Sequence, residues 1–324
     1  MFSMKLIKRL ILALLLACIC YPVFIVIYGL TKFTSSGKIN TKFKSARNAM
    51  GLENEVRVFN TSIDYSSAKQ IHKCVDMKIN TLEITPICVY DPEVDLFVSK
   101  YIINEGSWEG ALILEVVSIL RGDPNLEFFD FGCNVGVYTL AIAKFGRRVT
   151  ALDANQKNLE MLTTSLQMGN LTGMVTLIWN ALSDKKELVG FKERETNVGA
   201  LQMVSGVMNN SIVTDENSSM AIALDDLMPM LRNRPVVIKM DIEAFELKAM
   251  IGGKKFFDKV DVKFLLMEWV HHKDSDDGAR IIQFLTCRGF KPSNPLERSV
   301  TLKIDNRKSW PEDVLWIKDL NWII

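Results

Sequence analysis

From about residue 123 onward, short apolar runs alternate with longer segments whose apolar residues recur at helical spacing. The short runs lie at 126–131, 148–153, 175–179, 235–240 and 262–269. Such runs are typical of strands buried on both faces, which occur in parallel sheets whose strands are connected by helices. The alternation therefore predicts an α/β fold, with one open sheet and helices on both of its faces.

The segments between these runs are expected to supply the helices. Helices are predicted at 137–145, 156–168, 245–251 and 279–287. Gly169 and Asn170 end the second of them. Residues 185–217 are polar and irregular, which predicts a long loop over the edge of the sheet. The C-terminal runs 300–304 and 314–317 are expected to form a closing antiparallel hairpin or edge pair.

The N-terminal part of the chain contains a long apolar run. Residues 10–30 carry no charged side chain, and Lys5, Lys8 and Arg9 precede them. This run of 21 residues is long enough to cross a bilayer as a helix. A cleaved signal peptide is the alternative, but its apolar region normally spans about 7 to 15 residues and ends at a small-residue cleavage site. The favoured interpretation is a retained signal anchor, and hence a single-pass membrane protein.

The sequence therefore divides into five parts. They are a short tail (1–9), a transmembrane signal anchor (10–30), a stalk or linker (31–62), an N-terminal helical cap (63–122) and the α/β domain (123–324). The stalk is rich in Ser, Gly, Lys and Asn and shows little periodicity. The cap is expected to be helical because apolar residues recur at helical spacing, notably at Val94, Phe97, Val98, Tyr101 and Ile102.

The side of the membrane on which the domain lies is not decided by charge. Basic residues flank the span on both sides, with Lys32, Lys38, Lys42, Lys44 and Arg47 after it, so the positive-inside rule leaves the orientation open. Glycosylation sequons begin at Asn60, Asn170, Asn209 and Asn217. These sequons favour a luminal domain in the ER or Golgi, although the same residues are also ordinary in polar loops.

Charge and cysteine content exclude some classes of partner. Lys and Arg total 39 against 38 Asp and Glu, so the net charge of +1 gives no reason to expect a nucleic-acid partner. The six cysteines include no C-x-x-C pair, and with three histidines in the chain no metal site is expected. Two cysteines fall in the apolar run, and Cys133 and Cys287 fall in expected core elements. Cys74 and Cys88 remain as the one plausible disulfide, which the spacing alone leaves open.

The strongest local motif lies between the first strand of the sheet and the helix after it. It reads Asp130-Phe-Gly132-Cys-Asn134-Val-Gly136. In a parallel sheet, ligands bind beyond the carboxyl ends of the strands, and small residues there let a ligand approach the backbone. A carboxylate and an amide at this turn suit a cationic amino-acid tail better than phosphates. The alternative is that these are ordinary turn glycines between a strand and a helix.

Two further strand ends carry polar residues that suit a nucleoside. Asp153 ends the second strand, 23 residues after Asp130, where a carboxylate can accept both hydroxyls of a ribose. Asn180 and Ala181 follow the third strand, where the backbone could bracket an adenine ring. A simple Asx turn explains Asn180 equally well.

The fourth and fifth strands end in charged residues. Asp241 and Glu243 lie two positions apart after Lys239, so they share a side if the strand continues. They could hold the ligand, orient a hydroxyl or bind a metal, and the alternative is a solvated strand end with a lysine partner. His271 and His272 follow the strand that ends near Glu268, and His271 is a candidate general base.

Taken together, these motifs resemble those of the FkbM family of S-adenosylmethionine-dependent methyltransferases over roughly residues 95–295. The matching segments are DFGCNVG, LDAN, NALSD, Asn197-Val-Gly199, LDDL at 224–227, IKMDIEAFE and LLMEW. The resemblance implies a Rossmann-like class I methyltransferase sheet over 123–324 and bound S-adenosylmethionine. It also implies methyl transfer to an oxygen, typically a hydroxyl of a sugar or another small acceptor.

The resemblance also implies roles for individual residues. The methionine end of the donor would be lined by Asp130, Gly132, Asn134 and Gly136. Asp153 would hold the ribose, Asn180 and Ala181 would lie by the adenine, and Asp241 and Glu243 would face the acceptor. Asp241 or Glu243 is the first candidate for the base that accepts the hydroxyl proton, and His271 is the second.

The chain departs from the family pattern at two positions. Asp153-Ala154 stands where the family commonly has Glu-Pro, which leaves ribose binding credible. Glu243-Ala244 stands where Glu-Gly is common, which adds a methyl group at a tight turn.

Two other functions are compatible with parts of the sequence. One is a non-catalytic, membrane-anchored protein that binds a nucleoside or a partner through a degenerate methyltransferase fold. The other is a nicotinamide-dependent dehydrogenase, which is disfavoured because the pyrophosphate glycines are missing.

Overall fold

The structure is a computed structural model that describes residues 56–192, 202–204, 218–319 and 321. Residues 56–324 form one compact unit. The expected tail, the expected signal anchor at 10–30 and most of the expected stalk lie outside the described residues. Within the part of the chain that is described, no helix has the length and apolar character needed to cross a membrane.

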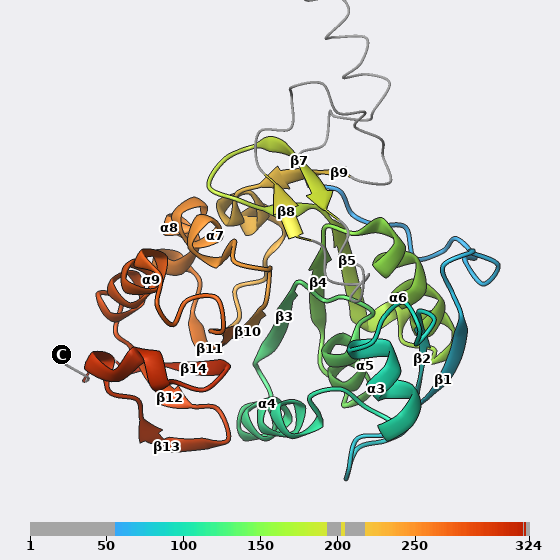
Figure 1. The fold of residues 1–324 in the computed structure, drawn as a ribbon, viewed down its shortest axis with the longest axis horizontal. Helices are drawn as coiled ribbons and strands as arrows, with labels where there is room; N and C mark the ends of the chain where they lie inside the picture. The colour runs from blue at the N-terminus through green and yellow to red at the C-terminus, as the bar shows by residue number, and fades with distance from the viewer. Residues whose placement is uncertain (1–55, 193–201, 205–217, 320, 322–324) are drawn as a thin grey trace, which may run out of the picture. The chain divides into compact units, whose positions relative to one another are not determined.

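The core of the unit is a sheet of eight strands in the order β13-β12-β14-β11-β10-β3-β4-β5 (Figure 1). Its strands are β3 (Glu127–Phe131), β4 (Val149–Asp153), β5 (Val175–Trp179), β10 (Val236–Met240), β11 (Val262–Glu268), β12 (Phe290–Asn294), β13 (Glu297–Thr301) and β14 (Asp313–Lys318). Five neighbouring strands of this sheet, β11, β10, β3, β4 and β5, run parallel to one another. The five strands predicted from the short apolar runs are confirmed, with boundaries that agree to within one residue.

The C-terminal strands do not form the expected edge hairpin. β14 lies inside the sheet, antiparallel to both β11 and β12, while β13 pairs with β12 at the edge. Burial explains the difference, because Val314, Leu315 and Trp316 are each at most 1% exposed, so both faces of β14 are covered. β13 is largely exposed, as a strand at the edge of a sheet can be.

Helices cover both faces of this sheet, as predicted (Figure 1). They are α3 (Val98–Glu105), α4 (Gly110–Gly122), α5 (Val137–Lys144), α6 (Gln156–Met168), α7 (Glu246–Gly252), α8 (Lys254–Lys259) and α9 (Asp276–Thr286). Short 3-10 helices lie at Thr172–Met174, Leu224–Met230 and Ile304–Ser309. The core on one face contains α3 to α6, and the core on the other contains α7 to α9. Phe128 packs into the first core and Phe129 into the second, as alternation along a strand requires.

The expected helical cap at 63–122 is helical only in its second half. Before α3 and α4, the chain forms an antiparallel hairpin of β1 (Lys73–Met77) and β2 (Thr85–Val89). Cys74 and Cys88 are directly opposite in this hairpin and form a disulfide, which confirms the pairing that the sequence left open. β2 packs on α5 and α6, so this region belongs to the same core as the sheet and is not a separate cap.

The end of the expected stalk, from residue 56, is part of the domain. The amide of Phe59 donates to the carbonyl of Leu177 at 2.8 Å, and the amide of Trp179 donates to the carbonyl of Arg57 at 2.8 Å. Residues 57–59 therefore lie along the free edge of β5. Phe59 is buried, and burial of an apolar side chain favours this docking over a free linker.

The segment expected to be an irregular loop at 185–217 contains strands. β6 (Ala181–Leu182), β7 (Glu187–Lys192), β8 (Gln202–Val204) and β9 (Ser218–Ile222) form a second sheet in the order β6-β9-β7-β8. Residues 193–201, which include the Asn197-Val-Gly199 motif, and residues 205–217 lie outside the described residues. The strands were missed because they are short and their partners are distant in the sequence.

Candidate functional site

A cavity opens beyond the carboxyl ends of β3, β4 and β10, beside the start of α5. It encloses about 790 Å³ that is free of protein atoms, including space open to solvent. Most of the residues predicted for a site line it: Gly132, Asn134, Asp153, Asn180, Ala181, Asp241 and Glu243.

The turn after β3 brings three strand ends together. Gly132 has φ +81°, and a Cβ built on it would lie 1.8 Å from the carbonyl oxygen of Asp241. The amide of Gly132 donates to the carbonyl of Leu152 at 2.9 Å. The ends of β3, β4 and β10 therefore approach so closely that this position excludes any side chain.

Gly136 has a different role from the one predicted. It has φ +93°, and a Cβ there would lie 2.2 Å from a methyl group of Leu162 on α6. Gly136 allows α5 to pack against α6, and it is not among the residues that line the cavity. Its predicted contact with the methionine end of a donor stays a prediction.

Asn134 links the turn to the end of β4. Its backbone is left-handed, with φ +49°, and its amide donates to Oδ2 of Asp153 at 2.7 Å. Its side-chain oxygen accepts from the amide of Val135 at 2.8 Å. Asn134 therefore positions the Asp153 carboxylate through its main chain.

Asp153 lies at the floor of the cavity and is only 7% exposed. Its Oδ1 accepts from the amide of Asn155 at 2.7 Å and from the side-chain amide of Asn158 at 3.2 Å. Burial raises the pKa of Asp153 to about 6, although the hydrogen bonds from Asn155, Asn134 and Asn158 oppose that rise. The carboxylate is therefore largely ionised at neutral pH and able to accept hydrogen bonds from a ligand.

Asp130 is buried and does not line the cavity. It is 1% exposed, and its Oδ2 accepts from the hydroxyl of Thr139 at 2.6 Å. Burial raises the pKa of Asp130, and the positive charge of Lys239 and the bond from Thr139 oppose the increase. The structure thus gives Asp130 contacts within the protein, and its predicted contact with a donor stays a prediction.

Asp241 has the lysine partner that the sequence suggested, but the lysine end of the pair is buried and not solvated. Nζ of Lys239 lies 3.0 Å from Oδ2 of Asp241 and 5.0 Å from the ring centre of Tyr138. Lys239 is 6% exposed. Burial alone would lower the pKa of Lys239, but the carboxylates of Asp241, Glu109 and Asp130 raise it above its ordinary value. The ammonium group is therefore a fixed positive charge in the wall of the cavity.

Glu243 and the residue after it are held in an unusual backbone conformation. Glu243 has φ +57° and Ala244 has φ +70°. Two consecutive left-handed residues that are not glycine are costly, at about 1–2 kcal/mol each, and such strain is found most often at functional sites. The conformation explains why the family commonly has a glycine at the second position.

His271 does not line the cavity but contacts a residue that does. Its Nε2 lies 3.6 Å from Oε2 of Glu243 and 3.7 Å from Oε2 of Glu268. The ligand atoms of these three residues lie within 4.8 Å of one another, close enough to hold a cation. Burial, followed by the carboxylates of Asp241, Glu243 and Glu246, raises the pKa of Glu268 well above its ordinary value.

His272 has a structural environment. It is 2% exposed, and its Nε2 lies 2.8 Å from Oε2 of the buried Glu246 on α7. The amide of Ile242 donates to the other oxygen of Glu246 at 2.9 Å. His272 therefore supports the turn after β10 and does not reach the cavity.

Asn180 lines the cavity with its side chain already engaged. Its Oδ1 accepts from the amide of Arg57 at 2.9 Å, and its Nδ2 donates to the carbonyl of Met220 at 3.0 Å. The side chain is fully buried. Asn180 therefore joins the N-terminal segment and the second sheet to the end of β5, and leaves Ala181 and Leu182 to present the apolar wall of the cavity.

The N-terminal region adds residues to the cavity that no sequence motif indicates. Val98, Trp108 and Glu109 line it from α3 and from the turn before α4. Glu109 accepts a hydrogen bond from the hydroxyl of Tyr138 at 2.7 Å. No motif marks these residues, because their contact with the cavity depends on tertiary packing. Tyr138 could have been suspected, since it follows the glycine turn by two residues.

Cys133 and Cys287 were both expected in the core. Cys133 is buried and lines the cavity, as expected of its place in the turn. Cys287 is exposed at the end of α9. That expectation was wrong because the last turn of the helix presents this position to solvent.

A sequence profile described as the methyltransferase FkbM domain matches residues 130–292, half of the chain. No curated protein matches the sequence significantly.

Several solved structures are similar to this chain at low sequence identity. One is a precorrin-6y C5,15-methyltransferase from Geobacter metallireducens, 13% identical over 60% of this chain and 77% of that chain, with a TM-score of 0.34. The cofactor-bound Rv0187 from MTB is 13% identical over 64% of this chain and 79% of that chain, with a TM-score of 0.37. The magnesium protoporphyrin IX methyltransferase from Synechocystis PCC 6803, with bound SAM, is 14% identical over 64% of this chain and 78% of that chain, with a TM-score of 0.33.

Proposed function

Because this chain belongs to the FkbM family of methyltransferases, we propose that it transfers a methyl group to a hydroxyl of a sugar, glycan or small molecule. Membership confirms the resemblance inferred from the motifs, and S-adenosylmethionine is the methyl donor. The observation that carries the proposal is the buried carboxylate of Asp153 at the floor of a cavity beside a turn without side chains at Gly132.

The residues around the cavity fit this donor. A ribose offers two hydroxyls, and the ionised carboxylate of Asp153 can accept from them. The wall formed by Ala181 and Leu182 suits an adenine ring. The absence of a side chain at Gly132 lets the end of β10 approach the turn after β3, which brings Asp241 beside the proposed donor site.

The charge of the cavity also fits a cationic ligand. Among the described residues that line it, four carry carboxylate groups, Glu109, Asp153, Asp241 and Glu243, and one, Lys239, carries an ammonium group. An amino-acid tail and a sulfonium both bring positive charge, which opposite charges nearby stabilise. The same surplus of carboxylates disfavours an acceptor that carries a phosphate or a carboxylate of its own.

The chemistry follows from this arrangement. S-Adenosylmethionine, when bound, supplies an electrophilic methyl carbon. The contribution of the chain is mainly to position an acceptor oxygen in line with that carbon and to exclude water. Asp241 and Glu243 accept hydrogen bonds from the acceptor hydroxyl, and one of them takes its proton.

His271 serves Glu243 and does not contact the acceptor in this proposal. Its Nε2 is 3.6 Å from the Glu243 carboxylate, so it can receive a proton from Glu243 or orient it. Glu268, whose raised pKa keeps it protonated at neutral pH, also lies beside His271, at 3.7 Å, and adds no further negative charge.

Two observations support a catalytic domain that lies in an oxidising lumen. The Cys74–Cys88 disulfide is typical of secreted and luminal proteins. The sequon residues Asn60 and Asn170 are exposed, as a glycosylated asparagine must be. We therefore retain the proposal that residues 10–30 anchor the chain in the ER or Golgi membrane.

The test of the proposed function is transfer of labelled methyl from S-adenosylmethionine to acceptors of defined charge. We expect transfer to neutral sugars or glycans and not to their phosphorylated counterparts. Transfer exclusively to anionic acceptors would contradict the proposed acceptor class. A folded chain that binds the donor but methylates no hydroxyl would favour the non-catalytic alternative.

A further inference from the structure

We propose that Tyr90 and Asn158 are positioning residues for the ribose-binding carboxylate of Asp153, and that the disulfide hairpin holds Tyr90 in place for this task. The inference rests on the proposed function, because it assumes that Asp153 contacts the donor. It goes further, since Tyr90 lies outside residues 130–292, to which the family profile matches. The N-terminal hairpin would then be part of the donor site.

A continuous chain of hydrogen bonds joins the three side chains. The hydroxyl of Tyr90 donates to Oδ1 of Asn158 at 2.7 Å. The Nδ2 group of Asn158 donates to Oδ1 of Asp153 at 3.2 Å. Tyr90 is 3% exposed, Asn158 is fully buried and Asp153 is 7% exposed. At this burial, water does not compete for the bonds, so each partner sets the orientation of the next.

The direction of these bonds gives Tyr90 a specific role. An asparagine amide can present either its oxygen or its nitrogen to a neighbour. Because the Tyr90 hydroxyl donates to the Asn158 oxygen, the Asn158 NH₂ group faces Asp153, whose carboxylate needs a hydrogen-bond donor. Burial first, and then the carboxylates of Asp153 and Asp95, raise the pKa of Tyr90 well above its ordinary value, so the phenol stays protonated.

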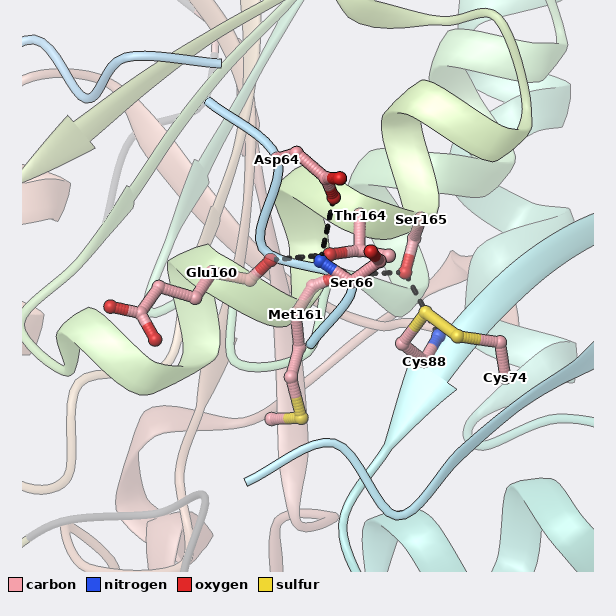
Figure 2. Close-up of a disulfide and its surroundings, with 8 residues drawn as sticks. All are labelled: Asp64, Ser66, Cys74, Cys88, Glu160, Met161, Thr164 and Ser165. Carbon is pink, nitrogen blue, oxygen red and sulfur yellow. Dashed lines mark hydrogen bonds between the residues drawn. A yellow bond between two sulfur atoms is a disulfide. The ribbon is translucent and has the colours of Figure 1, made fainter. Parts of the chain in front are cut away.

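The hairpin fixes Tyr90 against α6 at two points. The amide of Cys88 donates to Oγ of Ser165 at 2.9 Å, and Ser165 in turn donates to the carbonyl of Met161 (Figure 2). Ser165 lies seven residues after Asn158, hence on the same face of the helix two turns away. β2 and the residue after it therefore run along one face of α6, from the disulfide to Asn158.

Tyr90 is also held from its other side. Its amide donates to the hydroxyl of Ser99 at 3.1 Å, and that hydroxyl donates to the carboxylate of Asp95 at 2.5 Å. Ser99 and Asp95 are both fully buried. The phenol is thus placed by the hairpin, by α3 and by α6 together.

Removal of this support should change how Asp153 titrates. The hydrogen bond from Asn158 favours the ionised form of Asp153, as do those from Asn155 and Asn134. Asp130 raises the pKa of Asp153, and the Cys133 thiol and the Tyr90 phenol, which also face it, are uncharged at neutral pH. If Asn158 is free to turn, its donation weakens, and the pKa of Asp153 should rise further.

The experiment compares Tyr90→Phe with wild type in the full-length protein. Calorimetric titration with S-adenosylhomocysteine is repeated from pH 5 to pH 8. Because the ionised Asp153 accepts the ribose hydroxyls, affinity should fall as the pH falls through its pKa. We expect Tyr90→Phe to bind about fivefold more weakly at pH 7. We also expect the midpoint of its pH profile to lie at higher pH than in wild type.

Tyr65→Phe is the matched control. Tyr65 is half-buried and stacks on Phe59 at 5.6 Å, and it is not part of the Tyr90–Asn158–Asp153 chain of hydrogen bonds, so this variant should reproduce the wild-type affinity and midpoint. Thermal melting of each variant shows whether it is folded. Asn158→Asp gives a second variant, which removes the donor and adds a charge, and it should bind more weakly than Tyr90→Phe.

The outcomes separate the two proposals. If wild type binds and folded Tyr90→Phe keeps both its affinity and its midpoint, the inference is overturned while the proposed function stands. If affinity falls without any shift of the midpoint, Tyr90 has only a structural role and the inference is also wrong. If wild type itself fails to bind, the proposed function fails and the inference fails with it.

Discussion

The carbonyl oxygen of Asp241 occupies the place where a side chain on Gly132 would begin, 1.8 Å from the position of its Cβ. Gly132 follows β3 and Asp241 follows β10, which are adjacent parallel strands. The amide of Asp241 also donates to the carbonyl of Phe131 at 3.0 Å. The residue proposed to face the acceptor is thus fixed directly against the turn proposed to face the donor.

Replacement of Gly132 by alanine should therefore disrupt both the proposed acceptor site at Asp241 and the proposed donor site at the turn after β3. The added methyl group would meet backbone, which cannot move aside as a side chain can, and φ +81° is itself unfavourable for alanine. Gly146→Ala is the control, because Gly146 has φ +88° but no atom within 4 Å of a Cβ. We expect Gly146→Ala to lose about 1–2 kcal/mol of unfolding free energy.

The free energy of unfolding of Gly132→Ala should fall by about 1–3 kcal/mol more than that of Gly146→Ala, as measured by denaturant titration. It should also lose donor binding, whereas Gly146→Ala should retain it. Equal stability and equal donor affinity in the two variants would contradict the close approach of Gly132 to Asp241.

Asp241→Asn should separate turnover from donor binding. If Asp241 orients or deprotonates the acceptor hydroxyl, turnover should fall by about 100-fold or more while donor affinity changes little. Methyl-transfer kinetics and donor titration on the same sample measure both. Loss of donor affinity together with turnover would instead place Asp241 in the donor site. Asp184→Asn, at an exposed position, is the control.

The same substitution should lower stability, because it leaves the buried ammonium group of Lys239 without its partner at 3.0 Å. Asp241 is partly exposed and Glu109 and Asp130 also face Lys239, so the loss should be smaller than the roughly 3–5 kcal/mol that breaking a fully buried ion pair costs. The double variant Lys239→Met, Asp241→Leu should recover much of that loss without recovering turnover. A double variant no more stable than Asp241→Asn would argue against the importance of this pair.

Glu268→Gln should change how stability depends on pH. The pKa of Glu268 is raised above its ordinary value of 4.5, first by burial and then by the nearby carboxylates. Folding therefore takes up a proton, and the stability contributed by this group is present below pH 4.5 and lost as the pH rises. Glutamine cannot ionise, so the advantage of the variant in melting temperature should grow from pH 5 to pH 9.

Glu297→Gln is the control for that pH series, since Glu297 lies exposed on β13. Its melting temperature should follow that of wild type at every pH. A constant difference between Glu268→Gln and wild type across the range would show that Glu268 is not protonated in the folded state.

The disulfide hairpin should contribute measurably to stability. Cys74 and Cys88 are 14 residues apart, and a cross-link that closes a loop of about this length stabilises by about 3 kcal/mol in the chain-entropy account. The free energy of unfolding of the double variant Cys74→Ser, Cys88→Ser should be about 3 kcal/mol lower than that of wild type in denaturant titration under oxidising conditions. Cys287→Ser, at an exposed free cysteine, should lose nothing. Equal stabilities would contradict a formed bridge.

The parallel part of the fold could be predicted because its signals are local. Each buried strand is a short apolar run, and helix α6 begins and ends at the residues expected, 156 and 168. Since parallel strands end at one edge of the sheet, Asp153, Asp241 and the turn at Gly132 were correctly expected to lie together. Cavity lining by these residues follows from topology, whereas their roles toward a ligand stay predictions.

The remaining parts depend on contacts between distant segments. β1 and β2 are five residues each and include Asp76 and Pro86, which are rare in strands, so no strand pattern is visible. Their register is fixed by the disulfide and by packing on α6. Trp108 and Glu109 reach the cavity only because α4 packs beside α5. Such placement has no periodicity that a sequence can display.

The two glycines of the turn after β3 show that residues of one motif can have different roles that the sequence does not distinguish. Gly132 and Gly136 look equivalent in the sequence, and both have positive φ. Gly132 meets the end of a neighbouring strand at the cavity, while Gly136 meets Leu162 of a neighbouring helix outside it. Only the tertiary structure separates the glycine that admits a neighbouring strand end at the cavity from the glycine that admits a neighbouring helix outside it.

The most direct test of the account is calorimetric titration of the full-length protein with S-adenosylmethionine and S-adenosylhomocysteine, beside the variant Asp153→Ala. The account predicts that both ligands bind to wild type and that a folded Asp153→Ala binds neither measurably. Absence of binding to folded wild-type protein, or unchanged binding to the variant, would contradict the assignment of this cavity as the donor site.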